Sequence, residues 1–115
     1  MSEDILVWLH DIKKQIVQIE EFYVATEKSF EEFKRNTMLR KAIECNLEIA
    51  AEALNRILEK QPDFPVSNAR KIIGFRNRLA HEYDKLDDET VYSITILYLP
   101  QLLEEVDKVL ETHKP

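Results

Sequence analysis

Residues 76–83 gather, within eight positions, side chains suited to phosphate chemistry. Arg76 offers a permanently charged planar guanidinium that matches the oxygens of a phosphate. Histidine has an unperturbed pKa near neutral pH and can both take and give a proton, which makes His81 a candidate acid or base. Tyr83 adds a phenol. The segment has no carboxylate cluster with metal-ligand spacing, so a nuclease built on it is expected to work without metal.

The helical spacing of these residues limits which of them can act together. At about 100° per residue, Asn77 and His81 lie about 40° apart on one face of a helix, whereas Arg76 lies about 140° from His81. Arg76 and His81 can meet on one phosphate if the helix distorts near His81, if the long arginine wraps round it, or if a two-fold dimer brings both copies into one cleft. We favour the composite site of a homodimer.

Charge is unevenly distributed along the chain. The formal net charge of −6 argues against a nucleic-acid binder with a broad basic surface. Residues 69–85 nevertheless contain five basic and two acidic side chains. Such a local patch could hold a few phosphates or dock an acidic partner. Within it, Lys71 and Arg78 are interpreted as weak RNA contacts and not as catalytic groups.

Composition and length restrict the class of protein. The 115 residues suffice for a single core, so we expect one domain over residues 1–115. One glycine and four prolines favour an all-α fold. The single cysteine, Cys45, excludes an internal disulfide and is expected to be a small packing residue. No stretch approaches the roughly 20 apolar residues that cross a bilayer. We expect a cytoplasmic protein without a membrane segment, metal or cofactor.

The first helix is predicted from a capping serine and a long apolar stripe. Ser2 can cap a helix whose Glu3 and Asp4 lie at the positive end of its dipole. The stripe that follows has helical spacing and consists of Ile5, Trp8, Leu9, Ile12, Ile16, Ile19 and Tyr23. This face is expected to lie in the core.

A short helix and a long one are predicted next. Ser29 and Glu32 have the spacing of a capping box, in which each residue bonds the other's backbone N–H. Asn36 or Thr37 is expected to end this short helix and cap the following one. Apolar residues then continue at helical spacing over residues 38–60.

A break and a third main helix follow. Two prolines within residues 61–65 cannot continue a helix. Ser67 or Asn68 is expected to cap the next helix, which carries residues 76–81 and is predicted to end within residues 81–84.

The last helix is predicted to begin after Asp87 or Asp88 and to be kinked by Pro100. Its expected apolar stripe is Val91, Ile94, Leu97, Tyr98, Leu102, Val106, Val109 and Leu110. Together the patterns predict an up-and-down antiparallel bundle of four main helices with a short extra helix.

The motif itself resembles that of a known family. Arg76, Asn77, the four residues between Arg76 and His81, and Tyr83 are similar to the signature of the HEPN superfamily, specifically of HepT-like toxins. These toxins belong to the HepT/MntA toxin–antitoxin pairs.

The resemblance covers most of the chain after Phe30. Residues 42–53 are similar to the family's second long helix, and residues 91–103 resemble its last helix. Two positions depart from the pattern. Ala51 stands where a glycine is common, and Cys45 where an arginine is expected. Both departures concern helix packing or a secondary basic contact and leave the motif intact.

The resemblance implies a metal-independent endoribonuclease that acts as a homodimer. In that mechanism the RNA 2′-hydroxyl attacks the adjacent phosphate, with His81 as general acid or base, Arg76 stabilising the phosphoryl charge and Asn77 supporting them. The resemblance also implies an MntA-like nucleotidyltransferase antitoxin that transfers AMP to Tyr83 and so silences the enzyme.

Other interpretations stay open at this stage. Arg76 could pair with Glu48 or Glu52 of a neighbouring helix, and Tyr83 could be a core or interface ring. The chain could also be a non-catalytic helical partner that helps a nucleotidyltransferase bind its substrate, or a dimerisation bundle without a ligand. A docking module has no need for the complete set of Arg76, Asn77, His81 and Tyr83, which favours the toxin.

Overall fold

The chain folds into helices joined by short connections. The computed structural model describes residues 1–81 and 87–113, with the backbone alone for residues 76–81. In chain order the elements are α1 (Glu3–Ala25), α2 (Phe30–Arg35), α3 (Thr37–Lys60), α4 (Ala69–His81), α5 (Asp88–Ser93), the π-helical turn η2 (Ile94–Tyr98) and α6 (Leu99–Thr112). The all-α prediction is confirmed.

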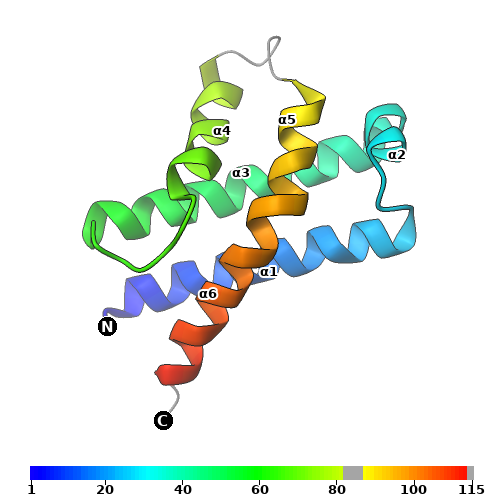
Figure 1. Ribbon diagram of the computed structural model, residues 1–115. Helices are drawn as coiled ribbons and strands as arrows, with labels where there is room; N and C mark the ends of the chain where they lie inside the picture. The colour runs from blue at the N-terminus through cyan, green and yellow to red at the C-terminus, as the bar shows by residue number, and fades with distance from the viewer. Residues whose placement is uncertain (82–86, 114–115) are drawn as a thin grey trace.

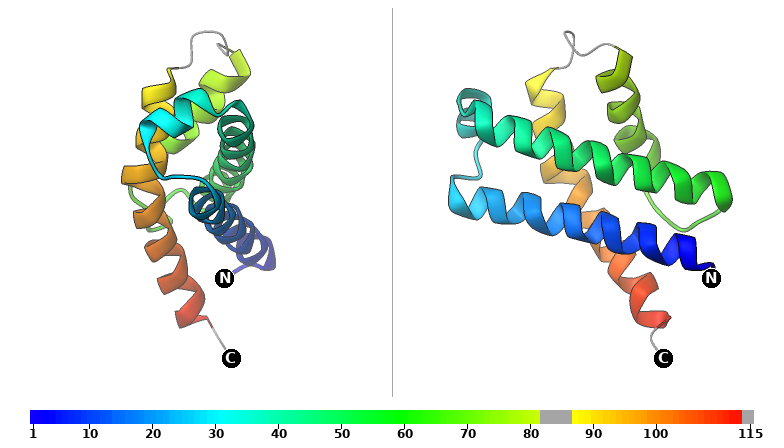
Figure 2. Two further views of the ribbon diagram at one scale, coloured as in Figure 1. Left: turned by 90° about the vertical axis from the view of Figure 1, so that its right-hand side faces the viewer. Right: turned by 180° about the vertical axis from the view of Figure 1, so that it is seen from behind.

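Two pairs of long segments form the bundle (Figure 1). α1 and α3 lie side by side in opposite directions and make the most extensive contact between two elements. α4 and the continuous arm of α5, η2 and α6 cross one face of that pair steeply, as the views in Figure 2 show. The short helix α2 lies beside α3 and α5. This is the predicted bundle of four main helices with a short extra one.

α1 begins and packs as its sequence predicts. The Ser2 hydroxyl accepts a hydrogen bond from the Ile5 amide at 3.2 Å, and Glu3 and Asp4 occupy the first turn. The predicted stripe is buried except for Trp8, which is partly buried against the core. No helix in the described part of the chain is long and apolar enough to cross a membrane.

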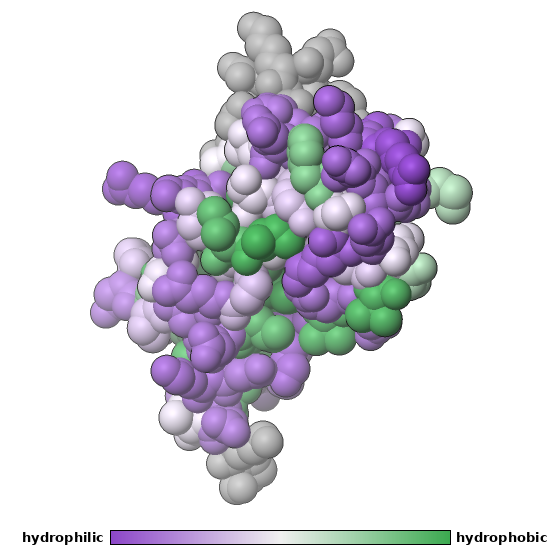
Figure 3. Space-filling model, turned by 45° about the vertical axis from the view of Figure 1, so that its right-hand side comes forward, coloured by the Kyte–Doolittle hydropathy of each residue, from purple (hydrophilic) through white to green (hydrophobic). Residues whose placement is uncertain are grey.

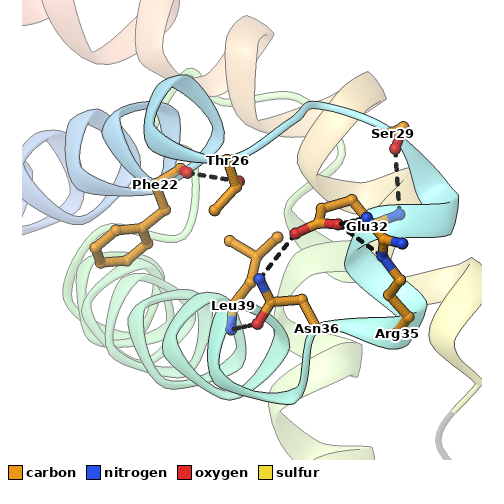
Figure 4. A network of polar contacts seen from close by, with 7 residues as sticks. All are labelled: Phe22, Thr26, Ser29, Glu32, Arg35, Asn36 and Leu39. Carbon is orange, nitrogen blue, oxygen red and sulfur yellow. Dashed lines mark hydrogen bonds and ion pairs between the residues drawn. The ribbon is translucent and has the colours of Figure 1, made fainter.

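Only one of the two hydrogen bonds of the predicted capping box between Ser29 and Glu32 forms. The Ser29 hydroxyl accepts from the Glu32 amide at 3.2 Å, as expected. The Glu32 carboxylate turns instead to the other end of α2, where it accepts from Asn36 Nδ2 at 2.8 Å and from Arg35 Nε at 2.9 Å (Figure 4). Hydrogen bonding to Asn36 and Arg35 lowers the pKa of Glu32.

Asn36 separates α2 from α3. Its side-chain oxygen accepts from the Leu39 amide at 3.0 Å, while its own backbone N–H bonds to the Glu32 carbonyl. Asn36 is therefore both the last cap of α2 and the first cap of α3, and Thr37 is the first residue of α3. Of the two predicted caps, Asn36 is the one the structure uses.

The side chain of Cys45 is exposed, so the prediction that it packs in the core is wrong. Its neighbours Ile43 and Leu47 belong to the fully buried face of α3. Cys45 lies two residues from each, which at about 100° per residue places it on the opposite side of the helix.

The predicted break at residues 61–65 separates α3 from α4. Ser67 and Asn68, the two predicted caps, turn their side chains to α6. The amide and hydroxyl of Ser67 donate to Glu105 at 3.1 Å and 2.8 Å, and Asn68 Nδ2 donates to Gln101 at 2.8 Å. The start of α4 is thereby fastened to α6.

A π-helical turn precedes Pro100. Asp87 caps α5 by accepting from the Glu89 amide at 3.1 Å. Further along, the Leu99 amide bonds to the Ile94 carbonyl, five residues back. The wider turn gives room for the Pro100 ring, which clashes with the preceding turn of a regular helix. The predicted disturbance at Pro100 thus takes the form of η2.

The π-helical turn also changes the predicted apolar stripe. Leu99 is fully buried, whereas Leu97 is 61% exposed and Tyr98 only partly buried. The prediction that Leu97 faces the core is therefore wrong, whereas Tyr98 packs against the core with part of its surface exposed. The extra residue of a π turn rotates the positions after it by about 100°, which brings Leu99 to the inner face.

Candidate functional site

The backbone of α4 carries five of the six predicted site residues, namely Lys71, Arg76, Asn77, Arg78 and His81. Arg76, Asn77 and His81 lie in its last two turns, and the helix continues unbroken to His81. A distortion of α4 before His81 is thus absent, which leaves a wrapping arginine or a dimer as the ways to join Arg76 with His81. The side chains of these three residues and of Arg78, and all of Tyr83, lie outside the described residues.

α4 is held from two sides. Ile72 and Phe75 are buried in the core, in the middle of α4, and the helix packs against α3. Its first turn is fastened to α6 through Ser67 and Asn68. The helix that carries the motif is therefore placed by the core and by hydrogen bonds from Ser67 and Asn68 to α6.

A groove with a volume of about 640 Å³ runs between α4 and the arm of α5 and η2. A volume of this size suits one small ligand. Its lining comes from both sides and comprises Arg70, Lys71, Gly74, Phe75, Asp87, Glu89, Thr90, Ser93, Ile94 and Tyr98. The groove thus follows the helix that carries the predicted catalytic residues.

Lys71 lies at one end of this groove, against Tyr98. Its ammonium donates to the Tyr98 hydroxyl at 2.9 Å and lies 4.9 Å from the centre of the ring. In the described part of the chain neither Lys71 nor Arg70 has a carboxylate partner. The expectation that Lys71 contacts an anion stays a prediction, and its position on the groove fits it.

The other end of the groove is acidic. Asp87 and Glu89 line it beside the start of α5. Asp87 is occupied by its capping bond to the Glu89 amide and by a hydrogen bond from the Thr90 hydroxyl. Because α4 and α5 run in opposite directions, the basic end of the groove lies at the start of α4 and the acidic end near its last turns (Figure 1).

A buried polar chain anchors η2 and was not predicted from the sequence. The Tyr23 hydroxyl lies 2.7 Å from the Thr95 hydroxyl, which donates to the Tyr92 carbonyl at 2.7 Å. Burial raises the pKa of Tyr23 to about 12. A threonine within the apolar run of the last helix was the available signal, because a buried hydroxyl requires a partner.

A second hollow of about 520 Å³ lies between α1 and α3, away from α4, and is lined by Trp8, Asp11, Glu48, Ile49, Glu52, Ala53 and Arg56. Hydrophilic side chains cover most of the face in Figure 3, with apolar patches between them. Among the described residues no group of three or more histidine, cysteine, aspartate or glutamate side chains could hold a metal ion. The motif on α4 and the adjoining groove therefore form the candidate site.

Comparison with known proteins identifies the family of this chain. The family model described as "HepT-like: Ribonuclease HepT-like" matches residues 12–109. The chain belongs to the HepT-like ribonuclease family. The match includes all of residues 76–83 and extends further toward the N-terminus than the resemblance noted from the sequence.

The relatives carry ribonuclease names. "Putative RNase MJ1216" of Methanocaldococcus jannaschii is 30% identical over 96% of this chain and 90% of its own length. "Putative RNase MJ0125" of the same organism is 29% identical over 96% of this chain and 94% of its own length. "Putative RNase TTE0752" of Caldanaerobacter subterraneus is 29% identical over 88% of this chain and 93% of its own length. No solved structure matches the chain significantly.

Proposed function

We propose that this protein is a metal-independent endoribonuclease and the toxin of a type VII HepT/MntA toxin–antitoxin pair. The observation that carries the proposal is the family match over residues 12–109, which contains the Arg76, Asn77, His81 and Tyr83 set. The unbroken course of α4 to His81, and its attachment to the core through Ile72 and Phe75, support a rigid mount for that set.

In this proposal the RNA supplies its own nucleophile. The 2′-hydroxyl attacks the adjacent phosphorus, and the 5′-oxygen of the next nucleotide leaves with a proton, which yields a cyclic phosphate and a 5′-hydroxyl. His81 takes or gives a proton, a role worth about 10²- to 10⁴-fold in rate. Arg76 stabilises the charge that grows on the phosphoryl oxygens, and Asn77 orients His81 or donates to the phosphate.

The proposed active form is a homodimer. On one regular helix Arg76 lies about 140° from His81, so a single copy does not easily bring both to one phosphate. A two-fold axis near the end of α4 would place Arg76 of one subunit beside His81 of the other. This arrangement makes dimerisation a condition for cleavage.

Regulation would act on the same segment. A nucleotidyltransferase antitoxin transfers AMP to the Tyr83 hydroxyl and releases pyrophosphate from ATP. The bound nucleotide is bulky and anionic and lies two residues from His81 in the sequence. It would occupy the phosphate site and repel RNA, because like charges at close range disfavour each other.

The test is cleavage of total cellular RNA by the purified protein in excess chelator, with analysis of the product ends. We expect cyclic-phosphate ends from the wild type and no cleavage by His81→Ala, with the dimer retained. His10→Ala, which changes an exposed histidine on α1, is the matched control and should cleave normally.

Two results would contradict the proposal. Full cleavage by His81→Ala would remove His81 from the mechanism. No cleavage by a wild-type protein whose intact mass shows no added AMP would favour the non-catalytic partner of a nucleotidyltransferase.

A further inference from the structure

The chain's single glycine lies in the middle of α4, on the wall of the groove. Its φ is not positive, so the backbone does not require glycine at position 74. Among the described residues no atom comes within 4 Å of the place where a Cβ at Gly74 would lie, so packing does not require it either. A glycine inside a helix costs about 0.5–1 kcal/mol relative to alanine. A Cβ at this position would lie in open space on the groove wall, so nothing in the described fold requires the glycine.

Two cations stand at the basic end of the same groove. Arg70 and Lys71 are exposed on the first turn of α4, and neither has a carboxylate partner in the described part of the chain. Lys13, Lys28 and Lys60 pair with carboxylates elsewhere, whereas Lys14 and Lys108, like Arg70 and Lys71, have no carboxylate partner among the described residues. Arg70 and Lys71 are thus available to an anion in the groove.

An aromatic ring faces these cations from the other wall. Tyr98 is partly buried at the end of η2, and its contact with Lys71 fixes both side chains at the groove. Thr95, in the same turn, is anchored to α1 through Tyr23. π-Helical turns are frequent at functional sites, and here the turn ends at an aromatic side chain that packs against the core and also lines the groove.

A cation pair, an aromatic ring and an exposed stretch of helix backbone are the elements with which proteins bind single-stranded nucleic acid. We propose that this groove binds one nucleotide of the single-stranded RNA substrate beside the cleaved phosphate. The nucleotide's phosphate lies on Arg70 and Lys71, and its base stacks on Tyr98 and passes close to Gly74. This inference rests on the proposed ribonuclease function and adds a substrate subsite to it.

The position of the groove agrees with this role. At 1.5 Å per residue, Gly74 lies about 10 Å along α4 from His81, and Lys71 about 15 Å. A nucleotide in the groove therefore neighbours the reacting phosphate along the strand.

Binding can be measured apart from cleavage. The probe is a fluorescent single-stranded oligonucleotide with 2′-O-methyl groups, which cannot attack the phosphate, in excess chelator. Its affinity is obtained by fluorescence anisotropy. If the protein binds this probe through the groove but never cleaves natural RNA, the proposed ribonuclease function fails while the subsite stands.

Gly74→Ala is the decisive variant, because it separates stability from binding. The added methyl group should raise the melting temperature by about 2–8 °C. It should lower the affinity for the probe by about fivefold or more, because the methyl group occupies space where the nucleotide approaches α4. Unchanged affinity in this folded and more stable variant would overturn the proposal.

Two further sets of variants test the ring and the cations. Tyr98→Ala should lower the affinity for the probe by about 5- to 150-fold, which is the effect of losing one stacking contact. Tyr98→Phe keeps the ring, and its affinity should lie within about twofold of that of the wild type. Equal losses in both would overturn the stacking role. Lys71→Gln should reduce the salt dependence of binding by about one ion. Lys14→Gln, an exposed lysine on α1, is the matched control and should bind normally.

Free nucleotides distinguish a strand from a single ligand. AMP and inorganic phosphate should compete with the probe only weakly, because each offers one phosphate and no continuing strand. Competition by AMP as strong as that of the unlabelled oligonucleotide would overturn the assignment to single-stranded RNA and make the groove a mononucleotide site.

Discussion

The Tyr23 hydroxyl on α1 lies 2.7 Å from the Thr95 hydroxyl in η2, although 72 residues separate them in the chain. Thr95 uses its own proton on the Tyr92 carbonyl. Tyr23 is therefore the donor to Thr95. Both side chains are buried, and the bond joins the first helix to the π-helical turn beside the groove.

Removing this donor should destabilise the fold. Tyr23→Phe leaves the buried Thr95 oxygen without the Tyr23 hydroxyl, and we expect the free energy of unfolding to fall by about 1–2 kcal/mol. Chemical denaturation measures the change. Tyr98→Phe is the control, because its hydrogen bond to Lys71 is exposed, and it should stay within about 0.5 kcal/mol. Equal losses in the two variants would contradict a special role for the buried bond.

The same tyrosine predicts how stability changes in alkali. Burial raises the pKa of Tyr23 from 10.0 to about 12. The folded state then holds a proton that the unfolded chain loses, so this contribution is complete below pH 10 and is lost as pH rises toward 12. The loss amounts to at most about 3 kcal/mol. The difference in unfolding free energy between the wild type and Tyr23→Phe should shrink across this window, and a constant difference would refute the assignment.

Glu44 predicts a pH dependence near acid. Burial raises its pKa, and Asp88 adds to the shift, while Arg40 and Lys41 oppose it. A raised pKa favours the protonated carboxyl, so its contribution to stability is complete below pH 4.5 and is lost as pH rises through the folded-state value. Glu44→Gln should therefore stabilise the protein at pH 7 more than at pH 4.

The matched control for Glu44 lies one turn further along α3. Glu48 is exposed, so Glu48→Gln should change stability by less than about 0.5 kcal/mol at both pH values. Urea unfolding at pH 4 and pH 7 measures both variants. A gain from Glu44→Gln that is the same at the two pH values would show that the ionised carboxylate is not the cause.

The cap between α2 and α3 should be costly to remove. Asn36→Ala loses the bond from the Leu39 amide and the bond to Glu32 together, and we expect a loss of about 1–2 kcal/mol. Asn55→Ala breaks only an exposed bond to Glu59 within α3 and should cost about 0.5 kcal/mol or less. Thermal unfolding compares the two, and similar costs would mean that the cap does not hold this junction.

Regulation by AMP can be separated from cleavage at Tyr83. Tyr83→Phe lacks the hydroxyl that accepts AMP, so we expect it to cleave RNA in the presence of the antitoxin and ATP, under which the wild type loses activity. Intact mass should show added AMP, about 329 Da, on the wild type alone. Tyr92→Phe is the control and should remain sensitive. Continued silencing of Tyr83→Phe would place the modification elsewhere or make inhibition non-covalent.

Local rules predicted most of the helices. Ser2, Asn36 and Asp87 cap helices as their residue types suggest, and the break at residues 61–65 follows from its prolines. These features depend on neighbours a few residues away, which is what a single sequence displays. The burial of Leu99 on the inner face was not predicted, because periodicity assumes a regular helix and η2 adds a residue.

The site was harder to predict than the fold. The motif was recognisable because its residues are close in sequence, and α4 carries Arg76, Asn77 and His81 as expected. The groove was not predictable, because Gly74 and Tyr98 meet across it from helices that only the tertiary fold brings together. The pairing of Tyr23 with Thr95 has the same origin. How the motif side chains meet stays a prediction.

The π-helical turn decides which of two adjacent side chains enters the core. Counted from the buried Val91 along a regular helix, Tyr98 would return to the inner face and Leu99 would point about 80° away. With the extra residue of η2, Leu99 takes the inner place and Tyr98 is released to the groove. Converting η2 to a regular helix with all its residues retained would exchange the two, so the aromatic wall of the groove depends on the π-helical winding of one turn.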